Sequence, residues 1–210
     1  MGRGSAGQRA GTAAAIALAA ALGYAVWWRR NPSPCPYGQR FWVDLPHPSI
    51  TRDRLLGALE PVAGERILEV GPGTGYYTLA VAERLGEQGR LDILDVQEAM
   101  LEHTVTRARA AGSGNVVPAR ADARSLPYPD ASFAGAFTCV ALGEVPEPGA
   151  ALAELRRVLE PGGRLVVGES YLDPHVVRRE RLRSEAEAVG LRLEGTRRGA
   201  LGYFARFVSV

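Results

Sequence analysis

The stretch Ile67-Leu-Glu-Val-Gly-Pro-Gly-Thr-Gly75 decides the fold of this 210-residue chain. A short apolar run from Arg66 to Val70 leads into three glycines spaced G-x-G-x-G, and a helical pattern follows from Tyr76 to Leu85. Glycine lets a backbone turn tightly and approach a ligand closely. The stretch therefore predicts a buried strand, a ligand-binding turn and a helix that presents free N–H groups at its start.

Strand-like and helix-like segments alternate outward from this stretch. Ser49 is a suitable N-cap for a helix before the first strand, and Pro161-Gly162-Gly163 ends a later helix. The alternation predicts a Rossmann-like α/β fold, a three-layer sandwich around a mostly parallel seven-stranded sheet. The last two strands have no helix between them, so one of them must run antiparallel as a hairpin strand. The expected strands are 66–70, 90–95, 116–117, 134–141, 164–168, 191–196 and 202–209, and the expected helices after the glycine turn are 76–85, 97–111, 148–159 and 177–189.

Two acidic residues lie where open α/β sheets bind ligands, beyond the carboxyl ends of predicted strands. Asp95 ends the second strand, and a carboxylate there can accept hydrogen bonds from both hydroxyls of a ribose. Asp122 precedes the fourth strand and can accept from an adenine amino group, while the next backbone N–H reads the ring. Each acid alone is also an ordinary strand-end or turn residue. With the glycine turn they predict a nucleoside site.

The glycine spacing separates this turn from the dinucleotide-binding pattern. That pattern requires G-x-G-x-x-G, and counting from Gly71 the sixth place is Tyr76. The acidic position alone does not distinguish an S-adenosylmethionine (SAM) site from a dinucleotide site, because both ligands carry a ribose.

Composition bears on several other classes of function. All 25 basic residues are arginine, they are spread among 23 acidic residues, and the net charge is only +2, so a clustered nucleic-acid-binding face is not expected. The two cysteines, Cys35 and Cys139, form no CxxC pair, and three histidines without cysteine neighbours make no zinc pattern. We expect two reduced thiols and no metal site.

The chain resembles the class I SAM-dependent methyltransferases, especially the ubiquinone/menaquinone-biosynthesis type. The resemblance runs over residues 49–209 and rests on four segments in order: ILEVGPGTG, LDILDVQEAML, DARSLPYPDASFAGAF and LAELRRVLEPGGRLVVGE. It implies SAM as the cofactor. It also implies that Glu69, Gly71, Gly73 and Gly75 line the methionine end of SAM, that Asp95 takes the ribose hydroxyls with Val96 beside the adenine, and that Asp122 and Ala123 hold the adenine edge.

The chain departs from the family pattern in two places. Ala134 stands where the family usually has an aspartate, and the loop after the fourth strand, Leu142 to Val145, replaces a frequent histidine pair. That loop faces the methyl group in the family, so the departure bears on the acceptor. Within it Glu144 is a candidate general base, or a residue that orients one, and His175 after the fifth strand is a second candidate. The competing interpretations are a carboxylate that caps the next helix for Glu144 and an ordinary structural residue for His175.

The resemblance predicts methyl transfer to a small acceptor, which we expect to be lipophilic. A dedicated base is not obligatory, because methyl transfer from a sulfonium can depend mainly on positioning. Two alternatives remain open. One is a SAM-binding protein without catalysis. The other is an aminopropyl transferase of similar fold, which would need a dense acidic pocket that the sequence does not reveal.

The N-terminal segment suggests a membrane anchor. Residues 11–28 carry no charge, and about 18 residues make about 27 Å of helix, close to the thickness of a hydrocarbon core. Trp27 and Trp28 beside Arg29 and Arg30 match an interfacial belt. A signal peptide and a peripheral or disordered segment are the alternatives.

The sequence therefore predicts three parts: a membrane segment over 1–30, a proline-rich extended connector over 31–48 and a methyltransferase domain over 49–210. Because SAM is cytosolic, the expected arrangement is a single N-terminal span with the catalytic domain in the cytoplasm. The connector's aromatic residues, Tyr37, Phe41 and Trp42, are expected to pack on the domain.

Overall fold

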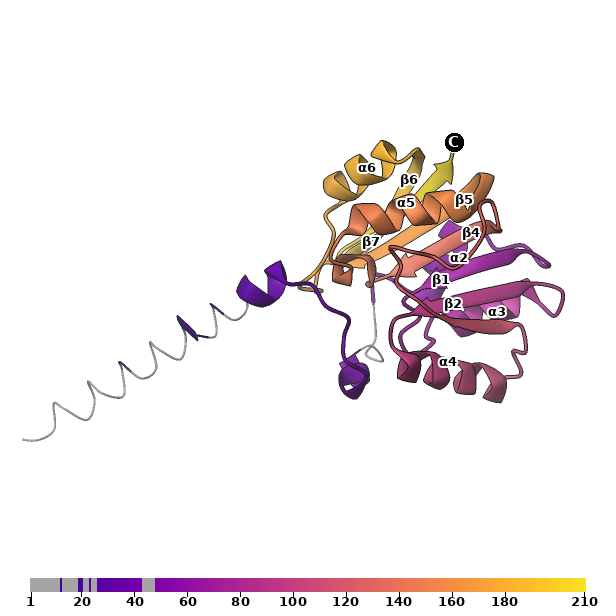
Figure 1. Ribbon diagram of the computed structural model, residues 1–210, viewed down its shortest axis with the longest axis horizontal. Coiled ribbons are helices and arrows are strands. Elements are labelled where there is room, and N and C mark those ends of the chain that lie inside the picture. The colour runs from indigo at the N-terminus through magenta and orange to yellow at the C-terminus, as the bar shows by residue number, and fades with distance from the viewer. Residues whose placement is uncertain (1–11, 13–18, 21–22, 24–25, 43–47) are drawn as a thin grey trace, which may run out of the picture. The chain divides into compact units, whose positions relative to one another are not determined.

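The computed structural model describes residues 12, 19–20, 23, 26–42 and 48–210 (Figure 1). These residues form two compact units that divide between Ser33 and Pro34. In the first unit, residues 12, 19–20, 23 and 26–30 are helical. The second unit contains the sheet and every element considered below.

The second unit alternates strands and helices along most of its length. Its elements, in chain order, are a 3₁₀ helix η1 (Tyr37–Trp42), α2 (Arg52–Leu59), β1 (Arg66–Val70), α3 (Thr78–Leu85), β2 (Arg90–Asp95), α4 (Glu98–Ala110), β3 (Val116–Arg120), β4 (Phe133–Cys139), a 3₁₀ turn η2 (Leu142–Glu144), α5 (Pro148–Val158), β5 (Leu159–Ser170), α6 (Arg179–Ala188), β6 (Leu191–Gly199) and β7 (Gly202–Ser209).

The seven strands form one sheet in the order β3-β2-β1-β4-β5-β7-β6. Strands β1 to β5 pair in parallel, and β7 runs antiparallel to both β5 and β6. The predicted fold, including the antiparallel hairpin strand at the C-terminus, is therefore confirmed. The strand order reverses between β1 and β4, and such a switch point is where open α/β sheets bind ligands.

Apolar side chains bury both faces of the sheet. Helices α2, α3 and α4 cover one face, where Leu59, Val81 and Leu101 join a core with the sheet residues Ile67 and Phe137. Helices α5 and α6 cover the other face, where Leu152, Leu155 and Leu182 pack with residues such as Leu68 and Leu165 (Figure 1). A sheet covered on both sides needs nearly continuous apolar strands, as β1 and β2 have. The carboxyl ends of β1 to β5 are thereby left as the open edge.

Some predicted boundaries are wrong for identifiable reasons. Helix α2 is capped by Thr51, whose hydroxyl accepts from the Arg54 N–H at 3.4 Å, whereas the predicted cap Ser49 accepts from the Leu201 N–H at 2.9 Å. The proline-rich connector is not extended throughout, because residues 37–42 form the 3₁₀ helix η1. Strand β5 starts at Leu159, so the Pro161-Gly162-Gly163 segment that ends the helix pattern belongs to a strand.

The predicted membrane span is not supported. In the part of the chain that the structure describes, no helix is long and apolar enough to cross a membrane. The single N-terminal span, and the membrane-anchored location of a cytoplasmic domain that was built on it, are therefore wrong predictions. The run is rich in alanine, whose small side chain contributes little apolar surface. Of residues 11–28, positions 11, 13–18, 21–22 and 24–25 lie outside the described residues.

Candidate functional site

The glycine turn lies at the end of β1 and needs glycine for both conformation and space. Gly71, Gly73 and Gly75 have φ angles of 72°, 55° and 85°, a region that L side chains rarely adopt. A Cβ on Gly71 would overlap the Cβ of Ala141 in the loop after β4. The Gly71 N–H donates to the carbonyl of Leu94 in β2 at 2.9 Å. The turn is therefore held between the ends of β2 and β4.

Two tyrosines between the turn and α3 delay the start of the helix. It begins at Thr78, two residues later than predicted, and Tyr77 is its N-cap residue without a side-chain cap. The buried Tyr77 hydroxyl donates to the Ile50 carbonyl at 2.5 Å, so this side chain packs inside the domain. The Tyr76 ring lies near the Arg52 guanidinium, 4.3 Å from ring centroid to Cζ. Tyr77 thus fixes the helix start.

Glu69 is the fourth of the five residues of β1 and is only 2% exposed. Its Oε2 accepts from the Thr78 hydroxyl at 2.6 Å. Burial raises the pKa of Glu69 to about 8, although the hydrogen bond from Thr78 acts in the opposite direction. The carboxyl therefore ties the end of β1 to the first turn of α3, on the two sides of the glycine turn.

The end of β2 presents Asp95 beside the loop that follows β3. One carboxylate oxygen, Oδ1, accepts from the Gln97 backbone N–H at 2.8 Å, and the Asp95 carbonyl accepts from the Ala121 N–H at 3.2 Å. Burial raises the pKa of Asp95. Val96 next to it is 41% exposed. These contacts bring the ends of β2 and β3 together, as a nucleoside site would require.

Asp122 already has a partner. Its carboxylate pairs with the Arg124 guanidinium at 2.8 Å and accepts from the Arg124 backbone N–H at 2.8 Å, and these bonds lower its pKa. Ala123 is buried in the core beneath. An adenine amino group would therefore have to share the Asp122 carboxylate with the Arg124 side chain or displace that side chain.

The loop after β4 packs against the loop after β5. A Cβ on Gly143 would overlap the carbonyl oxygen of His175, so the two backbones are in direct contact. The His175 backbone N–H donates to Asp173 Oδ1 at 2.6 Å. Since Ala141 of the same loop meets Gly71, the loops after β1, β4 and β5 form one continuous surface.

Glu144 lies within this surface and does not cap the next helix. The N-cap residue of α5 is Glu147, while Glu144 Oε2 accepts from the Cys35 backbone N–H at 3.1 Å. Burial, followed by the negative charges of Asp173 and Asp95, raises the pKa of Glu144 to about 8 against the effect of the Cys35 hydrogen bond. A carboxyl with that pKa is suited to exchange protons near neutral pH.

Residues 34–37, which we call the N-terminal strap, cross the same edge. The Gln97 side chain donates to the Cys35 carbonyl at 2.9 Å and accepts from the Tyr37 N–H at 3.0 Å. The Tyr37 ring meets His103 edge-on with centroids 6.0 Å apart, so this aromatic residue packs on the domain as expected, whereas Phe41 is mostly exposed. Nothing in the sequence pattern indicated the strap's hydrogen bonds.

Two further carboxyls at this edge were missed from the sequence. Glu169, next to last in β5, is almost fully buried, and its Oε2 accepts from the Val177 N–H at 3.2 Å while Oε1 has no partner. Burial and the charges of Asp173 and Glu144 raise its pKa well above the ordinary value. Burial also raises the pKa of Asp173. Glu169 and Asp173 therefore add two acidic side chains near Glu144, from β5 and the loop after it.

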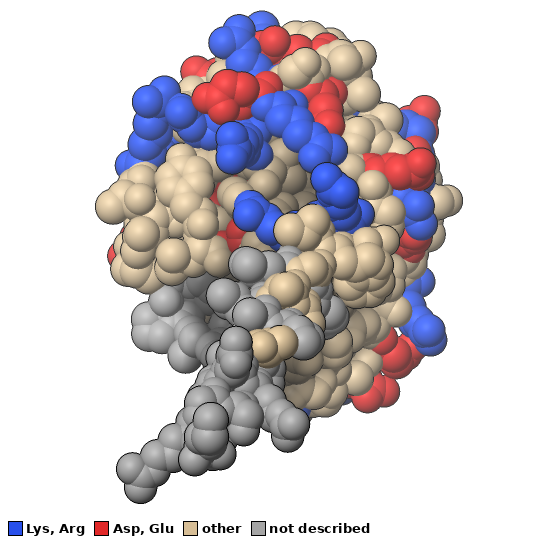
Figure 2. Space-filling view, turned by 90° about the vertical axis from the view of Figure 1, so that its left-hand side faces the viewer, with Lys and Arg blue, Asp and Glu red and all other residues tan. Residues whose placement is uncertain are grey.

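An apolar rim adjoins these carboxyls. Leu172 is 70% exposed, Tyr171 45% and Leu201 38%, and the Tyr171 N–H donates to the Leu201 carbonyl at 2.9 Å. Figure 2 views the molecule from the left-hand side of Figure 1 and shows arginine and acidic side chains intermixed over the upper part of that face.

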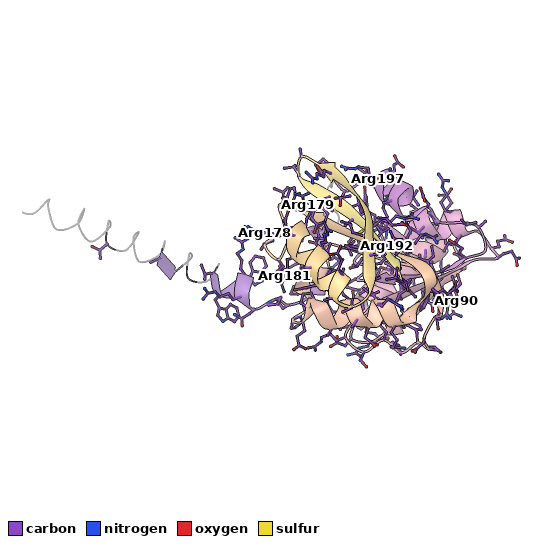
Figure 3. All side chains as sticks on the ribbon, turned by 90° about the horizontal axis from the view of Figure 1, so that it is seen from above. Arg90, Arg178, Arg179, Arg181, Arg192 and Arg197 are labelled. Carbon is purple, nitrogen blue, oxygen red and sulfur yellow. The ribbon has the colours of Figure 1, made fainter. Side chains whose placement is uncertain are left out.

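Several arginines of α6 and β6 lie on the outside of the domain. Figure 3 places Arg178, Arg179 and Arg181 at the start of α6 and Arg192 on β6. Several are paired along the helix, as Arg181 is with Glu185 at 2.7 Å. Among the described residues, no group of three or more His, Cys, Asp or Glu side chains is arranged to hold a metal ion.

The sequence matches known methyltransferases. Residues 67–163 match a family model described as a methyltransferase domain. The chain is 43% identical over 117 residues to a demethylmenaquinone methyltransferase from Clavibacter sepedonicus, which covers 56% of this chain and 46% of that protein. It is 38% identical over 109 residues to the ubiquinone/menaquinone biosynthesis C-methyltransferase UbiE from Teredinibacter turnerae, covering 50% and 43%. The chain thus spans less than half the length of these curated relatives.

Solved structures share the fold. A SAM-dependent methyltransferase from Aquifex aeolicus superimposes with a TM-score of 0.77 at 22% identity, over 84% of this chain and all of that one. The [4+2]-cyclase SpnF superimposes with a TM-score of 0.63 at 29% identity, over 70% of this chain and 57% of that one.

Proposed function

Since residues 67–163 belong to a SAM-dependent methyltransferase domain of class I, similar to that of the UbiE type, we propose that this protein transfers a methyl group from SAM to a small lipophilic acceptor. The observation that carries the proposal is the continuous edge that joins the glycine turn, Asp95 and the loops after β4 and β5. A cofactor half and an acceptor half of one site adjoin there.

The residues of the cofactor half fit SAM. The glycine turn brings its backbone close to the ends of β2 and β4, and Asp95, whose Oδ1 accepts from the Gln97 N–H, ends β2 as a half-buried carboxylate for a ribose hydroxyl. Val96 offers an apolar surface for an adenine ring. We assign the methionine end to Glu69 and the three glycines, and the adenine edge to Asp122 and Ala123. When bound there, SAM supplies an electrophilic methyl group carried on a sulfonium.

The acceptor half combines a proton-accepting group with an apolar surround. Glu144 is the group we assign to hold or remove a proton of the acceptor, and His175 lies in the neighbouring loop as the second candidate. The rim of Tyr171, Leu172 and Leu201 favours a lipophilic molecule, because burying exposed apolar surface stabilises binding. The names of the relatives point the same way, toward a quinone-like ring.

A change at Asp95 tests the cofactor half. Asp95→Ala should weaken the binding of S-adenosylhomocysteine by about 1.5–3 kcal/mol, the usual scale for losing hydrogen bonds to a charged group. Calorimetry on the full chain measures this directly. Asp53→Ala, which removes a carboxylate from the first turn of α2, is the control and should leave the affinity unchanged. Binding of NAD in place of S-adenosylhomocysteine would contradict the cofactor assignment.

Methyl transfer itself is tested with labelled SAM. The protein is incubated with a total lipid extract and, separately, with an aqueous small-molecule extract. We expect label in lipid-soluble products. Label only in water-soluble products would refute the lipophilic acceptor but would still support methyl transfer. SAM binding without any labelled product from either extract would refute methyl transfer, an outcome worth testing because one fold can host unrelated reactions.

A further inference from the structure

The N-terminal strap crosses the middle of the candidate site. Gln97 follows β2, Glu144 follows β4, and β1 lies between these two strands in the sheet. The strap is bonded on one side to Gln97 and on the other to Glu144. It must therefore pass over the end of β1, where the glycine turn begins.

The Gln97 side chain makes two hydrogen bonds to the strap, one as donor and one as acceptor. Its amide nitrogen donates to the Cys35 carbonyl and its amide oxygen accepts from the Tyr37 N–H, at 2.9 and 3.0 Å. Its own backbone N–H donates to Asp95 Oδ1 at 2.8 Å. One residue thus contacts both the ribose-binding candidate and the strap, and the two side-chain bonds fix residues 35–37 in one register.

The strap in turn contacts the candidate base. The Cys35 N–H points to Glu144 Oε2 at 3.1 Å, which leaves Oε1 for another partner. The bonded path therefore runs from Asp95 through Gln97 and Cys35 to Glu144, linking the end of β2 to the loop after β4. A backbone N–H that donates to a carboxylate favours its charged form and fixes its direction.

We propose that Gln97 is a positioning residue, which acts through the strap to place Glu144 toward the acceptor and to cover the cofactor half of the site. This inference rests on the proposed methyl transfer and adds to it a part of the chain outside the matched domain. The strap thus lines one side of the site. Loss of the Gln97 side-chain bonds would free the strap without removing any group that touches SAM or the acceptor.

The rate at which the Cys35 thiol is alkylated measures how firmly the strap is held, and this measurement does not depend on catalysis. Cys35 is half-buried, and burial together with Glu144 and Asp173 raises the pKa of its thiol, so iodoacetamide should alkylate it slowly. Cys139 is partly buried against the core at the end of β4, where its pKa is raised well above the ordinary value, and serves as the internal reference. In Gln97→Met, which keeps the side-chain length but makes neither bond, we expect Cys35 to react at least fivefold faster. Gln88→Met, on an exposed turn, should react as the wild type does.

A second measurement separates positioning from simple packing. Glu144 is faced by Asp95 from β2, by Glu169 and Asp173 from β5 and the loop after it, and by Cys35 from the strap. Releasing the strap removes the Cys35 bond, which lowers the pKa of Glu144, and exposes the carboxyl to water, which reduces the larger effect of burial, so the midpoint of the kcat–pH profile should shift in Gln97→Met. Gln97→Glu, which retains only the bond from Tyr37, should also release Cys35.

The outcomes distinguish this inference from the proposed function. Equal alkylation rates in wild type and Gln97→Met would overturn the role of Gln97, whatever reaction the protein performs. Faster alkylation with an unchanged pH midpoint would show that Gln97 holds the strap but does not position Glu144, which also refutes the proposal as stated. If the protein shows no methyl transfer, in contrast, the alkylation rates still test whether Gln97 holds the strap.

Discussion

Replacing Gly143 by alanine should destabilise the domain by about 3 kcal/mol, the upper range for forcing an extra methyl group into a packed site. The new Cβ would overlap the His175 carbonyl oxygen and lie 2.8 Å from the carbonyl carbon. A backbone cannot rotate away as a side-chain end can, so the loops after β4 and β5 must separate. For a domain of this size the melting temperature should fall by roughly 6–12 °C.

The same separation should remove activity, because it displaces Glu144 from the surface that joins the two halves of the site. Thermal unfolding and turnover are measured on the same preparation. Gly149→Ala is the matched control, since a Cβ at that position, in the first turn of α5, meets nothing within 4 Å. A Gly143→Ala protein that melts with the wild type would mean that the two loops are not in contact.

Glu144→Gln should lower kcat about 100-fold, the low end of what a general base contributes, with little change in SAM affinity. The amide keeps the size of the side chain and can still accept from the Cys35 N–H, so the strap should stay in place. Glu147→Gln, three residues on and highly exposed, is the matched control. Undiminished turnover in Glu144→Gln would assign the proton transfer elsewhere or show that positioning alone suffices.

The pH dependence of kcat shows which protonation state of Glu144 is active. With a pKa of about 8, the Glu144 carboxyl is mainly protonated at neutral pH, and its base form accumulates only as the pH rises through about 8. Wild-type kcat at saturating substrates should therefore increase across that range and level off above it. The Glu144→Gln profile should lack this rise. A wild-type profile that falls with pH would instead indicate that the protonated form is the active one.

The sequence predicted the parts of the fold that depend on neighbouring residues. Strands β1 and β2 have the predicted bounds, because each is an apolar run enclosed by turn residues. The start of α3 was missed, because the residues from Gly73 to Tyr77 turn before the helix begins. The pairing of Asp122 with Arg124 was also visible in principle, since the two residues are only two positions apart.

The candidate site could be predicted only in part. The glycine turn and Asp95 were found because they follow strands whose ends must meet at one edge. Glu169 was missed because it continues an apolar strand, and only the assembled sheet shows how deeply it is buried. The assignment of roles to Glu69, Asp95, Glu144 and His175 stays a prediction. The hydrogen bonds of the strap could not be predicted, because its partners lie far along the chain.

The strap has a consequence for how the protein is made. It leaves the ribosome before the sheet does, yet Gln97 and Glu144 lie 62 and 109 residues after Cys35. At about 5–20 residues per second, the segment from Cys35 to Glu144 takes roughly 5–20 s to synthesise. During that time the strap lacks at least one of its two partners, and β5, β6 and β7 have not yet been synthesised. The first part of the site to be translated is therefore among the last to be fixed in place.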